Sequence, residues 1–478
     1  MTRVGTGPET ALTGSRRWFA LAALTGANML VFASVTIMHV ALPAARSDLT
    51  LSTGATHLVV TLYSLTFGTF ILLAGRLADV FGLRRCLVAG LIGFAAASLL
   101  GGMAPDGVTL LLARVLQGGA GAFVAATAVS LMSVCFPSGR DREIAFAVLG
   151  VVMGIGTAGS FLLAGALVDV LSWRWCLLVN VPLAAVIAGV IGRTAPRGPR
   201  RTGSRIDIIG AVLICVSLAA LVAGLDRVTA WGWWNGRTLG LLVGGLIGFG
   251  LFVTALRRAD EPLVPLHLMA DRNRVAAFVA AAFVGIAMFA GMFVLTSFLQ
   301  EVRGSSPVRT GLAFVPFAVA AILTTWALPR ARARVSAARV LGVGLFLAGA
   351  GVATFTLLEP GSTYLGGVLP AMLLLGSGGT VVMITASDVA TQGASADSGV
   401  AGSLVNSAQQ VGAALGTALL TSIINVTTRD ELSAGTDAGA AAIAGYARAG
   451  LTGALLLFAS AILVSIVPGQ RRLAHARR

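Results

Sequence analysis

The sequence predicts an all-α integral membrane protein with fourteen transmembrane helices. Of its 478 residues, 56% are hydrophobic and only 11% are charged, whereas soluble globular chains carry roughly 25% charged residues. Apolar runs of roughly 20 residues recur along the chain, and a helix of that length crosses a hydrocarbon core of about 30 Å. Composition and run length together exclude a soluble globular fold.

The apolar runs follow one another with short gaps between them, and these gaps hold most of the charges. The shortest separation, residues 104–107, lies between the third and fourth runs. The first run follows Arg16 and Arg17 but is too long for the core of a signal peptide, so we expect it to be an uncleaved first helix. The predicted spans are residues 18–40, 56–74, 86–104, 108–134, 144–168, 175–192, 207–225, 238–256, 275–299, 311–328, 340–358, 364–386, 399–424 and 449–467.

The charges of the gaps predict the orientation in the membrane. The formal net charge is +15, and all 34 basic residues are arginine. Most of these arginines fall in the N-terminal tail, the even-numbered gaps and the C-terminal tail. The positive-inside rule then predicts a bacterial inner-membrane protein with both termini in the cytoplasm. Topology accounts for the positive charge, so we expect no nucleic-acid partner.

A faint internal repeat predicts the domain organisation. The gap between spans 2 and 3 reads GRLADVFGLRR (75–85), and the gap between spans 10 and 11 reads PRARARVSAAR (329–339). An offset of eight spans indicates two six-helix halves with two helices inserted between them. Repeated halves with a binding site at their interface are typical of transporters. The predicted divisions are residues 1–192, 193–274 and 275–478.

Seven stretches, in order along almost the whole chain, resemble the major facilitator superfamily, and specifically its fourteen-span drug/proton antiporters. The loop signature G-x-L-A-D-x-x-G-x followed by two basic residues is matched by GRLADVFGLRR. The span-4 signature R-x-x-Q-G is matched by RVLQGGAGA (114–122). The other five stretches are TIMHVALP (36–43), WRWCLLVNVP (173–182), RIDIIGAVL (205–213), LQEVRGSSPVRTGLAFVP (299–316) and GVAGSLVNSAQQVGAALG (399–416).

This resemblance implies a major facilitator-type fold and a secondary transporter. Such a protein would export drug-like or natural-product small molecules by alternating access, coupled to protons. The implied partners are the small-molecule substrate, protons and the lipid bilayer; we expect a monomer with no cofactor and no metal. The alternative is a facilitator, or a transporter of a small metabolite that is not coupled to protons. A polytopic membrane enzyme is disfavoured because the four histidines are scattered and no HExxH motif occurs.

In the resembled family the loop between spans 2 and 3 is a cytoplasmic latch that holds the two halves together. Glycines would let helix ends approach closely and turn tightly, and Asp79 could accept hydrogen bonds from arginines or from a helix N-terminus. Alternatively, the arginines only fix the topology, which would require neither Asp79 nor the glycines. The gating-loop residues are Gly75, Arg76, Asp79, Gly82, Arg84 and Arg85.

One arginine, Arg114, falls inside a span, at a cost of roughly 2.5–3.5 kcal/mol for a central position. We expect it to face the interior and to meet a carboxylate, a carbonyl or water; the alternative is that it extends to the cytoplasmic surface. Gln117 lies on nearly the same helical face. The resemblance implies that Arg114 takes part in proton coupling.

Span 1 departs from the family pattern L-D-x-T-I-V-N-V-A-L-P, since this chain reads ASVTIMHVALP. Ser34 stands at the position of the family's membrane carboxylate, and His39 replaces the asparagine. His39 has an ordinary pKa near 6.5 and could carry the proton instead. It could equally be a neutral hydrogen-bonding residue. Span 5 also lacks the family's G-P-x-x-G-G motif.

No carboxylate lies deep in a predicted span, so we expect a largely apolar substrate cavity with uncharged polar groups. Phe289, Met292 and Phe293 are candidate apolar lining, although aromatic residues at helical spacing more often serve packing. The candidate cavity residues are Asn28, Phe32, Ser34, Gln300, Asn406, Gln409 and Gln410.

Overall fold

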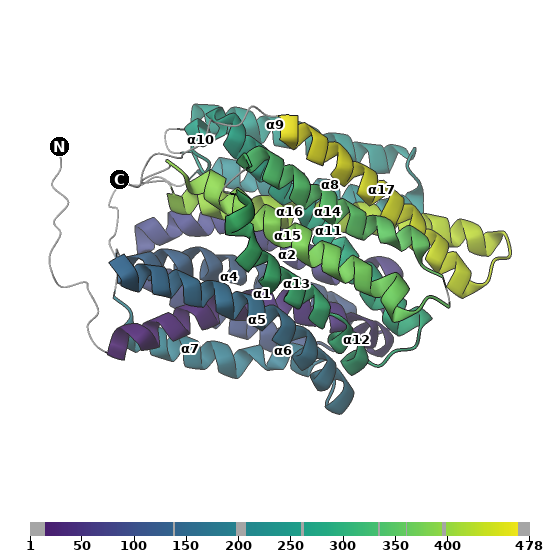
Figure 1. The fold of residues 1–478 in the computed structure, drawn as a ribbon, viewed down its shortest axis with the longest axis horizontal. Coiled ribbons are helices and arrows are strands. Elements are labelled where there is room, and N and C mark those ends of the chain that lie inside the picture. The colour runs from purple at the N-terminus through teal and green to yellow at the C-terminus, as the bar shows by residue number, and fades with distance from the viewer. Residues whose placement is uncertain are drawn as a thin grey trace.

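Long helices lie side by side along the longest axis of the molecule in the computed structural model (Figure 1). The structure describes residues 15–136, 139–196, 207–259, 262–332, 335–359, 361–393 and 398–466, and every regular element within these ranges is helical. The first turn of α1 and the last turn of α17 lie toward the same end of the bundle (Figure 1).

The helices follow the order of the predicted spans. Their bounds are α1 Ser15–Asp48, α2 Thr53–Phe81, α3 Leu83–Gly102, α4 Gly107–Cys135, α5 Gly139–Val170, α6 Trp175–Leu178, α7 Asn180–Thr194, α8 Ile208–Trp231, α9 Gly236–Arg258, α10 Leu266–Ala270, α11 Arg272–Ser297, η1 Phe298–Val302, α12 Pro307–Ala313, α13 Val315–Arg332, α14 Ala337–Ala353, η2 Thr354–Leu357, η3 Tyr364–Val368, α15 Leu369–Thr391, α16 Ser398–Ser433 and α17 Ala438–Ile466.

Thirteen segments in the described part of the chain are long and apolar enough to cross a membrane. The 32-residue helix α5 occupies the place of the fifth predicted span, and Gly159–Val170 is its described apolar part. The all-α membrane fold is therefore confirmed, and a total of fourteen spans agrees with it. Several helices extend beyond their predicted limits. For example, α16 continues nine residues past 424 to Ser433. The end of an apolar run therefore does not mark the end of the helix.

Helices that are close in the chain pack into groups, and several contacts join early helices to late ones. Helices α2, α3 and α4 pack on one another and α1 packs on α5, while α11 packs on α16 and α14 packs on both α15 and α17. The most extensive joining contacts are α2 on α16 and α5 on α12, and α5 also contacts α13. Helices α8 and α9 pack as a pair, and α8 also contacts α16 and α2. The predicted division at residues 192 and 274 stays a prediction.

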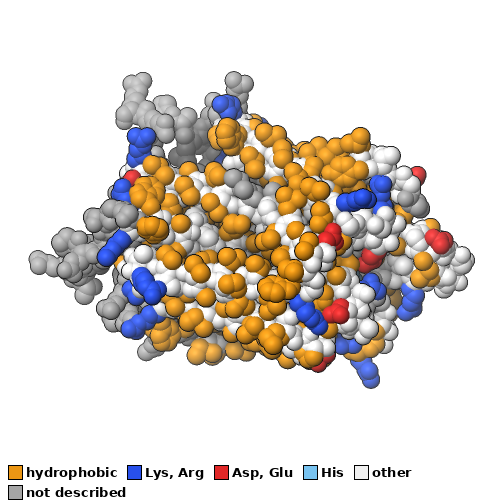
Figure 2. Space-filling model, turned by 90° about the horizontal axis from the view of Figure 1, so that it is seen from below, with side chains coloured by type: hydrophobic (Ala, Val, Ile, Leu, Met, Phe, Trp, Pro, Cys, Tyr) orange, Lys and Arg blue, Asp and Glu red, His pale blue; other side chains and the backbone are white. Residues whose placement is uncertain are grey.

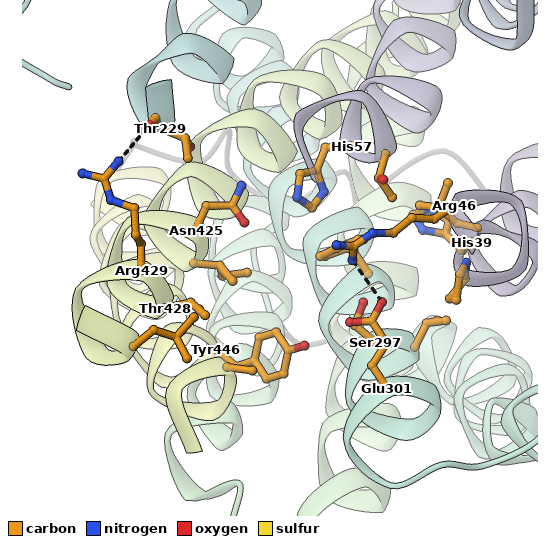
Figure 3. A pocket seen from close by; sticks show the side chains of 18 residues that line it. His39, Arg46, His57, Thr229, Ser297, Glu301, Asn425, Thr428, Arg429 and Tyr446 are labelled. Carbon is orange, nitrogen blue, oxygen red and sulfur yellow. Dashed lines mark hydrogen bonds and ion pairs between the residues drawn. The ribbon is translucent and has the colours of Figure 1, made fainter. Parts of the chain in front are cut away.

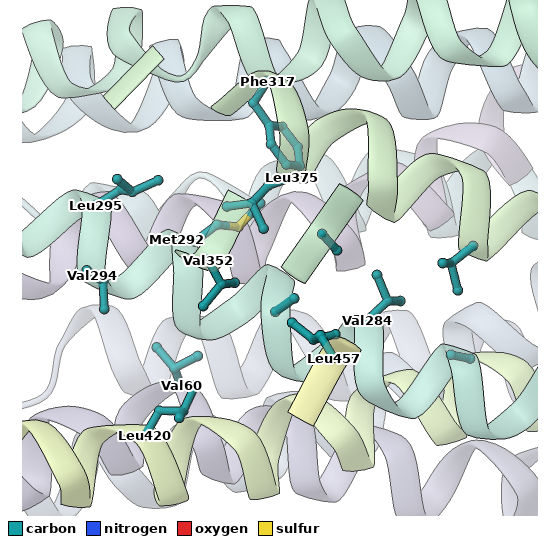
Figure 4. Close-up of a cluster of buried hydrophobic side chains, with 14 of the residues drawn as sticks. Val60, Val284, Met292, Val294, Leu295, Phe317, Val352, Leu375, Leu420 and Leu457 are labelled. Atoms are coloured by element: carbon teal, nitrogen blue, oxygen red, sulfur yellow. The ribbon is translucent and has the colours of Figure 1, made fainter. Parts of the chain in front are cut away.

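Glycine allows the closest of these contacts. A Cβ atom added to Gly412 of α16 would lie 1.9 Å from the Ala282 carbonyl oxygen, and one added to Gly285 of α11 would lie 2.0 Å from the Gln409 carbonyl oxygen. Two membrane helices approach this closely only through small residues, because lipid chains compete with larger side chains for packing. Aliphatic side chains such as Val284, Leu295 and Leu457 fill the core around them (Figure 4).

The outer surface has the character of a membrane protein. Figure 2 shows hydrophobic side chains across the middle of one face, with arginines toward the two ends and acidic side chains gathered toward one of them. Large apolar side chains such as Ile92, Leu246 and Leu323 are more than half exposed. A soluble domain does not expose so many of them, whereas a hydrocarbon environment requires them.

Candidate functional site

A cavity of about 460 Å³ lies at one end of the bundle, where α1, α11 and α16 end and α2 and α17 begin. This is the end opposite the 75–85 loop, because α2 runs from the cavity toward that loop over 29 residues. Small-molecule sites usually measure roughly 300–1,000 Å³. The polar lining residues are His39, Arg46, Thr56, His57, Thr229, Thr296, Ser297, Glu301, Asn425, Thr428, Arg429 and Tyr446 (Figure 3).

Two buried histidines are the most unusual groups of the cavity wall. The His39 ring lies 5.9 Å from the Phe289 ring, and the His57 ring lies 4.6 Å from the Phe293 ring. The nitrogens of both imidazoles are buried; the Asn425 side chain lies beside His57, whereas the His39 nitrogens form no hydrogen bond within the described residues. A buried polar group without a partner costs about 1–3 kcal/mol. His39 can therefore gain a partner when a polar ligand or water enters the cavity.

Charged groups connect helices across the mouth of the cavity. A guanidinium nitrogen of Arg46 lies 3.7 Å from a Glu301 carboxylate oxygen, which joins the end of α1 to η1 (Figure 3). Arg429 donates a hydrogen bond of 3.4 Å to the Thr229 carbonyl and so joins α16 to α8. Both side chains of the ion pair are roughly two-fifths exposed, and an exposed pair of this kind contributes only about 0–1 kcal/mol. The Arg46–Glu301 ion pair is therefore a weak link between α1 and η1.

Arg114 is completely buried and faces the interior, so the alternative that it extends to the surface is wrong. Its Nε donates to the Val59 carbonyl at 3.0 Å, and its Nη1 donates to the Gln117 Oε1 at 2.5 Å. Gln117 in turn donates to the Ser98 hydroxyl at 2.8 Å. The guanidinium carbon lies 4.3 Å from the centre of the Tyr63 ring. A carbonyl, an amide and an aromatic ring thus surround the charge.

Two arginines of the 75–85 loop bind main-chain carbonyls of other segments. Arg84 donates to the Gly192 carbonyl at 2.6 Å and to the Ala195 carbonyl at 3.2 Å, both at the end of α7. Arg76 donates to the Pro262 carbonyl at 2.8 Å, in the segment after α9. Cations at helix C-termini are stabilised by the exposed carbonyl groups there. These two side chains therefore tie the loop to its neighbours.

The remaining residues of the 75–85 loop differ in backbone conformation, burial and contacts. Gly82 separates α2 from α3 and has φ of +96°, a value that favours glycine. Gly75 lies inside α2, and an added Cβ would meet nothing within 4 Å, so the expected close approach is wrong for this glycine. Asp79 is half-buried, and it forms no hydrogen bond or ion pair with the described residues. Arg85 is exposed.

None of the seven cavity residues expected from the sequence lines this cavity, whereas Phe293 does. Asn28 and Asn406 donate to carbonyls of their own helices, at Leu24 and Gly402. Gln300 donates to the Val40 carbonyl at 3.2 Å. Phe32 packs edge-on against Phe67, Ser34 is buried, Gln409 is half-buried, and Met292 lies in the core.

Gln410 lies instead where α16 packs on α2. A Cβ added to Gly68 would lie 3.0 Å from the Gln410 Cβ, and the Ser407 hydroxyl donates to the Gly68 carbonyl at 2.5 Å. We call this contact between Gly68 of α2 and residues 407–411 of α16 the α2–α16 seam. It lies between the cavity and the end of the bundle that carries the 75–85 loop, and α2 and α16 are in close contact there.

Sequence reasoning missed His57, Arg46, Glu301, Asn425 and Tyr446 as site residues. Each lies near the end of a predicted span, where a polar residue is ordinary and attracts no notice. One signal was available, because the alternation of spans places all five positions on the same side of the membrane. A search for polar groups that share a side, rather than polar groups deep in a span, would have grouped them.

Comparison with known proteins agrees with the fold and with the seven stretches. The Major Facilitator Superfamily model matches residues 24–417. The chain is 40% identical to the puromycin resistance protein of Streptomyces alboniger over 85% of this chain and 82% of that protein. It is 32% identical to the cephamycin export protein of Amycolatopsis lactamdurans, over 95% and 93% of the two chains.

A third relative is the tetracenomycin C resistance and export protein of Streptomyces glaucescens, at 34% identity over 86% of this chain and 77% of that one. Among solved structures, an auto-inhibited peptide transporter of the POT family superposes with a TM-score of 0.68 at 15% identity, covering 96% of this chain and 99% of that chain. This last likeness shows the fold alone. The chain is thus not an enzyme but a membrane transporter that belongs to the major facilitator superfamily.

Proposed function

We propose that this transporter exports drug-like or natural-product small molecules across the bacterial inner membrane by alternating access, driven by the proton gradient. The observation that carries the proposal is the cavity, which lies at one end of the bundle between helices from the early and late parts of the chain. Relatives whose names state antibiotic resistance or export, at up to 40% identity, support the substrate class.

The arginine-rich gaps support an outward-facing assignment for this conformation. The cavity lies opposite the 75–85 loop, and the positive-inside rule places that loop in the cytoplasm. The α2–α16 seam then closes the cytoplasmic path, while the weak Arg46–Glu301 contact lies near the outer opening. In our proposal the inward-facing state forms when residues 1–192 and 275–478 rock against each other, which opens the seam.

Export is tested by expression in an efflux-deficient bacterium. Cells that carry the protein should accumulate less of at least one compound in a panel that includes puromycin, lincomycin and a cephamycin. Membrane insertion is verified with a C-terminal fluorescent fusion. Undiminished accumulation of every compound, with insertion confirmed, contradicts the exporter proposal.

Proton coupling is assigned to His39 within this proposal. It is the ionisable side chain that span 1 contributes in place of the missing carboxylate, it is buried, and it lies on the cavity wall. We expect His39→Gln to abolish the dependence of export on an imposed pH gradient in inside-out vesicles while the protein stays folded. His57→Gln is the matched control, since it removes a second buried cavity histidine of the same chemistry.

Three outcomes distinguish the alternatives. If the His39 variant keeps full gradient-driven export, His39 is structural. If both variants lose coupling equally, the two histidines act as one unit and the assignment to His39 alone is wrong. If an uncoupler leaves export by the unmodified protein unchanged, the protein is a facilitator or uses another driving force.

A further inference from the structure

The positive charge of Arg114 has no negative partner in the part of the chain that the structure describes. Its three contacts, the Val59 carbonyl, the Gln117 amide and the Tyr63 ring, are all neutral. No described Asp or Glu forms an ion pair with it, and its Nη2 is buried without a hydrogen-bond partner among these residues. A buried charge normally persists only beside an opposite charge. The interior around α4 therefore carries an unbalanced positive charge.

This charge lies next to the cavity. The Arg114 Nε donates to the Val59 carbonyl, and Val59 lies less than one helical turn along α2 from the cavity-lining residues Thr56 and His57. The charged groups of the described wall are Arg46, Arg429 and Glu301. Because Glu301 already pairs with Arg46, the wall adds no free negative charge that could balance Arg114.

We infer that the cavity takes cargo that carries a negative charge or no charge, and that it discriminates against organic cations. This inference rests on the proposed function and specifies its substrate class. In general, two unit charges about 8 Å apart, at an effective dielectric constant of about 20, interact strongly enough to change a binding constant roughly thirtyfold. Screening by water in the open mouth reduces this figure, so we expect a preference of about tenfold for an anion over a matched cation.

The names of the relatives leave the charge of the cargo open. A cephamycin carries a carboxylate, whereas puromycin carries an amine. The deciding feature therefore lies in this chain, in the buried charge of Arg114 and its neutral contacts.

The test uses equilibrium binding to the purified full-length protein in lipid nanodiscs. The probes share one fluorophore: 7-diethylaminocoumarin-3-carboxylate, its neutral methyl amide, and its trimethylammonioethyl amide. The informative variant is Gln117→Glu, because it places a carboxylate oxygen where an amide oxygen already lies 2.5 Å from Arg114. Gln117→Glu also removes the hydrogen bond that the Gln117 amide donates to Ser98. Ser98→Ala is the matched control, because it removes that hydrogen bond without adding a charge.

The unmodified protein should bind the carboxylate probe about tenfold more tightly than the trimethylammonium probe, with the neutral amide between them. Gln117→Glu should remove most of this ratio, and Ser98→Ala should leave it unchanged. As a second pair, His39→Asp should shift the ratio toward the cation relative to His39→Asn, which has the same size and no charge. Equal affinity for the three probes, a preference for the cation, or a ratio that Gln117→Glu does not change overturns the inference.

The proposed export function and the inferred charge preference are refuted by different results. Export of an antibiotic by cells, measured as described above, does not depend on the charge ratio of the coumarin probes. A protein that exports puromycin and also prefers the cationic probe would keep its proposed function and lose this inference. A folded protein that binds none of the probes counts against the cavity as an anion-selective cargo site.

Discussion

The adjacent glycines of the RVLQGG stretch differ sharply in their surroundings, and this difference yields a prediction with an internal control. A Cβ added to Gly118 would lie 2.1 Å from the Thr66 hydroxyl oxygen and 2.4 Å from the Tyr63 carbonyl oxygen, both on α2. A Cβ added to Gly119 would meet nothing within 4 Å. Gly118→Ala should therefore disturb the protein, whereas Gly119→Ala should not.

The magnitude follows from these distances. Cβ contacts shorter than 3.0 Å are essentially never seen, so α2 and α4 must separate by at least about 0.6 Å near Tyr63, and overpacking of this kind costs about 1–3 kcal/mol. Rotation of Thr66 would relieve only the shorter contact, since the Tyr63 oxygen belongs to the main chain. The displacement would also move the Tyr63 ring that lies over Arg114.

The assay compares thermal unfolding in detergent and export activity for both alanine variants. Gly118→Ala should unfold at a temperature several degrees lower than the unmodified protein and lose most of its export. Gly119→Ala should match the unmodified protein in both measurements. If both variants unfold at the same temperature as the unmodified protein, the close contact between α2 and α4 does not exist at this position, and the geometry assigned to Arg114 loses its support.

Two further predictions concern the 75–85 loop. Gly82→Ala should lower both stability and export, because alanine is strained at φ of +96°, whereas Gly75→Ala should change neither, because its surroundings are open; thermal unfolding and export of the two variants check this. Asp79→Asn should abolish export if the loop is a latch, yet leave the affinity for cargo intact in a protein cross-linked in the outward-facing state. Loss of affinity in the cross-linked protein would show that Asp79 contacts cargo directly.

The sequence was sufficient for the fold because membrane insertion depends on length and hydrophobicity, which are properties of segments and not of contacts. The site was harder to predict. Arg114 could be identified because a charge inside an apolar run is rare, and its neighbour Gln117 lies on the same helix. Its other two partners, Val59 and Tyr63, could not be identified, since they lie on another helix and neither is conspicuous. His57 and Glu301 escaped notice because their importance comes from shared location at one end of the bundle, and only the packing of α1, α2 and α11 brings them together.

Helix α8 gives the cavity an asymmetry that the predicted repeat cannot supply. Its Thr229 lines the cavity, and it is bound to α16 through Arg429 and through the Ser422 hydroxyl, which donates to the Leu225 carbonyl at 2.5 Å. Thr229 lies outside the α2–α16 seam and outside the contact between α11 and α16. Substitutions at Thr229 can therefore reshape one side of the cavity while those two helix contacts stay intact. Such a position allows cargo preference to evolve separately from the packing of α2, α11 and α16.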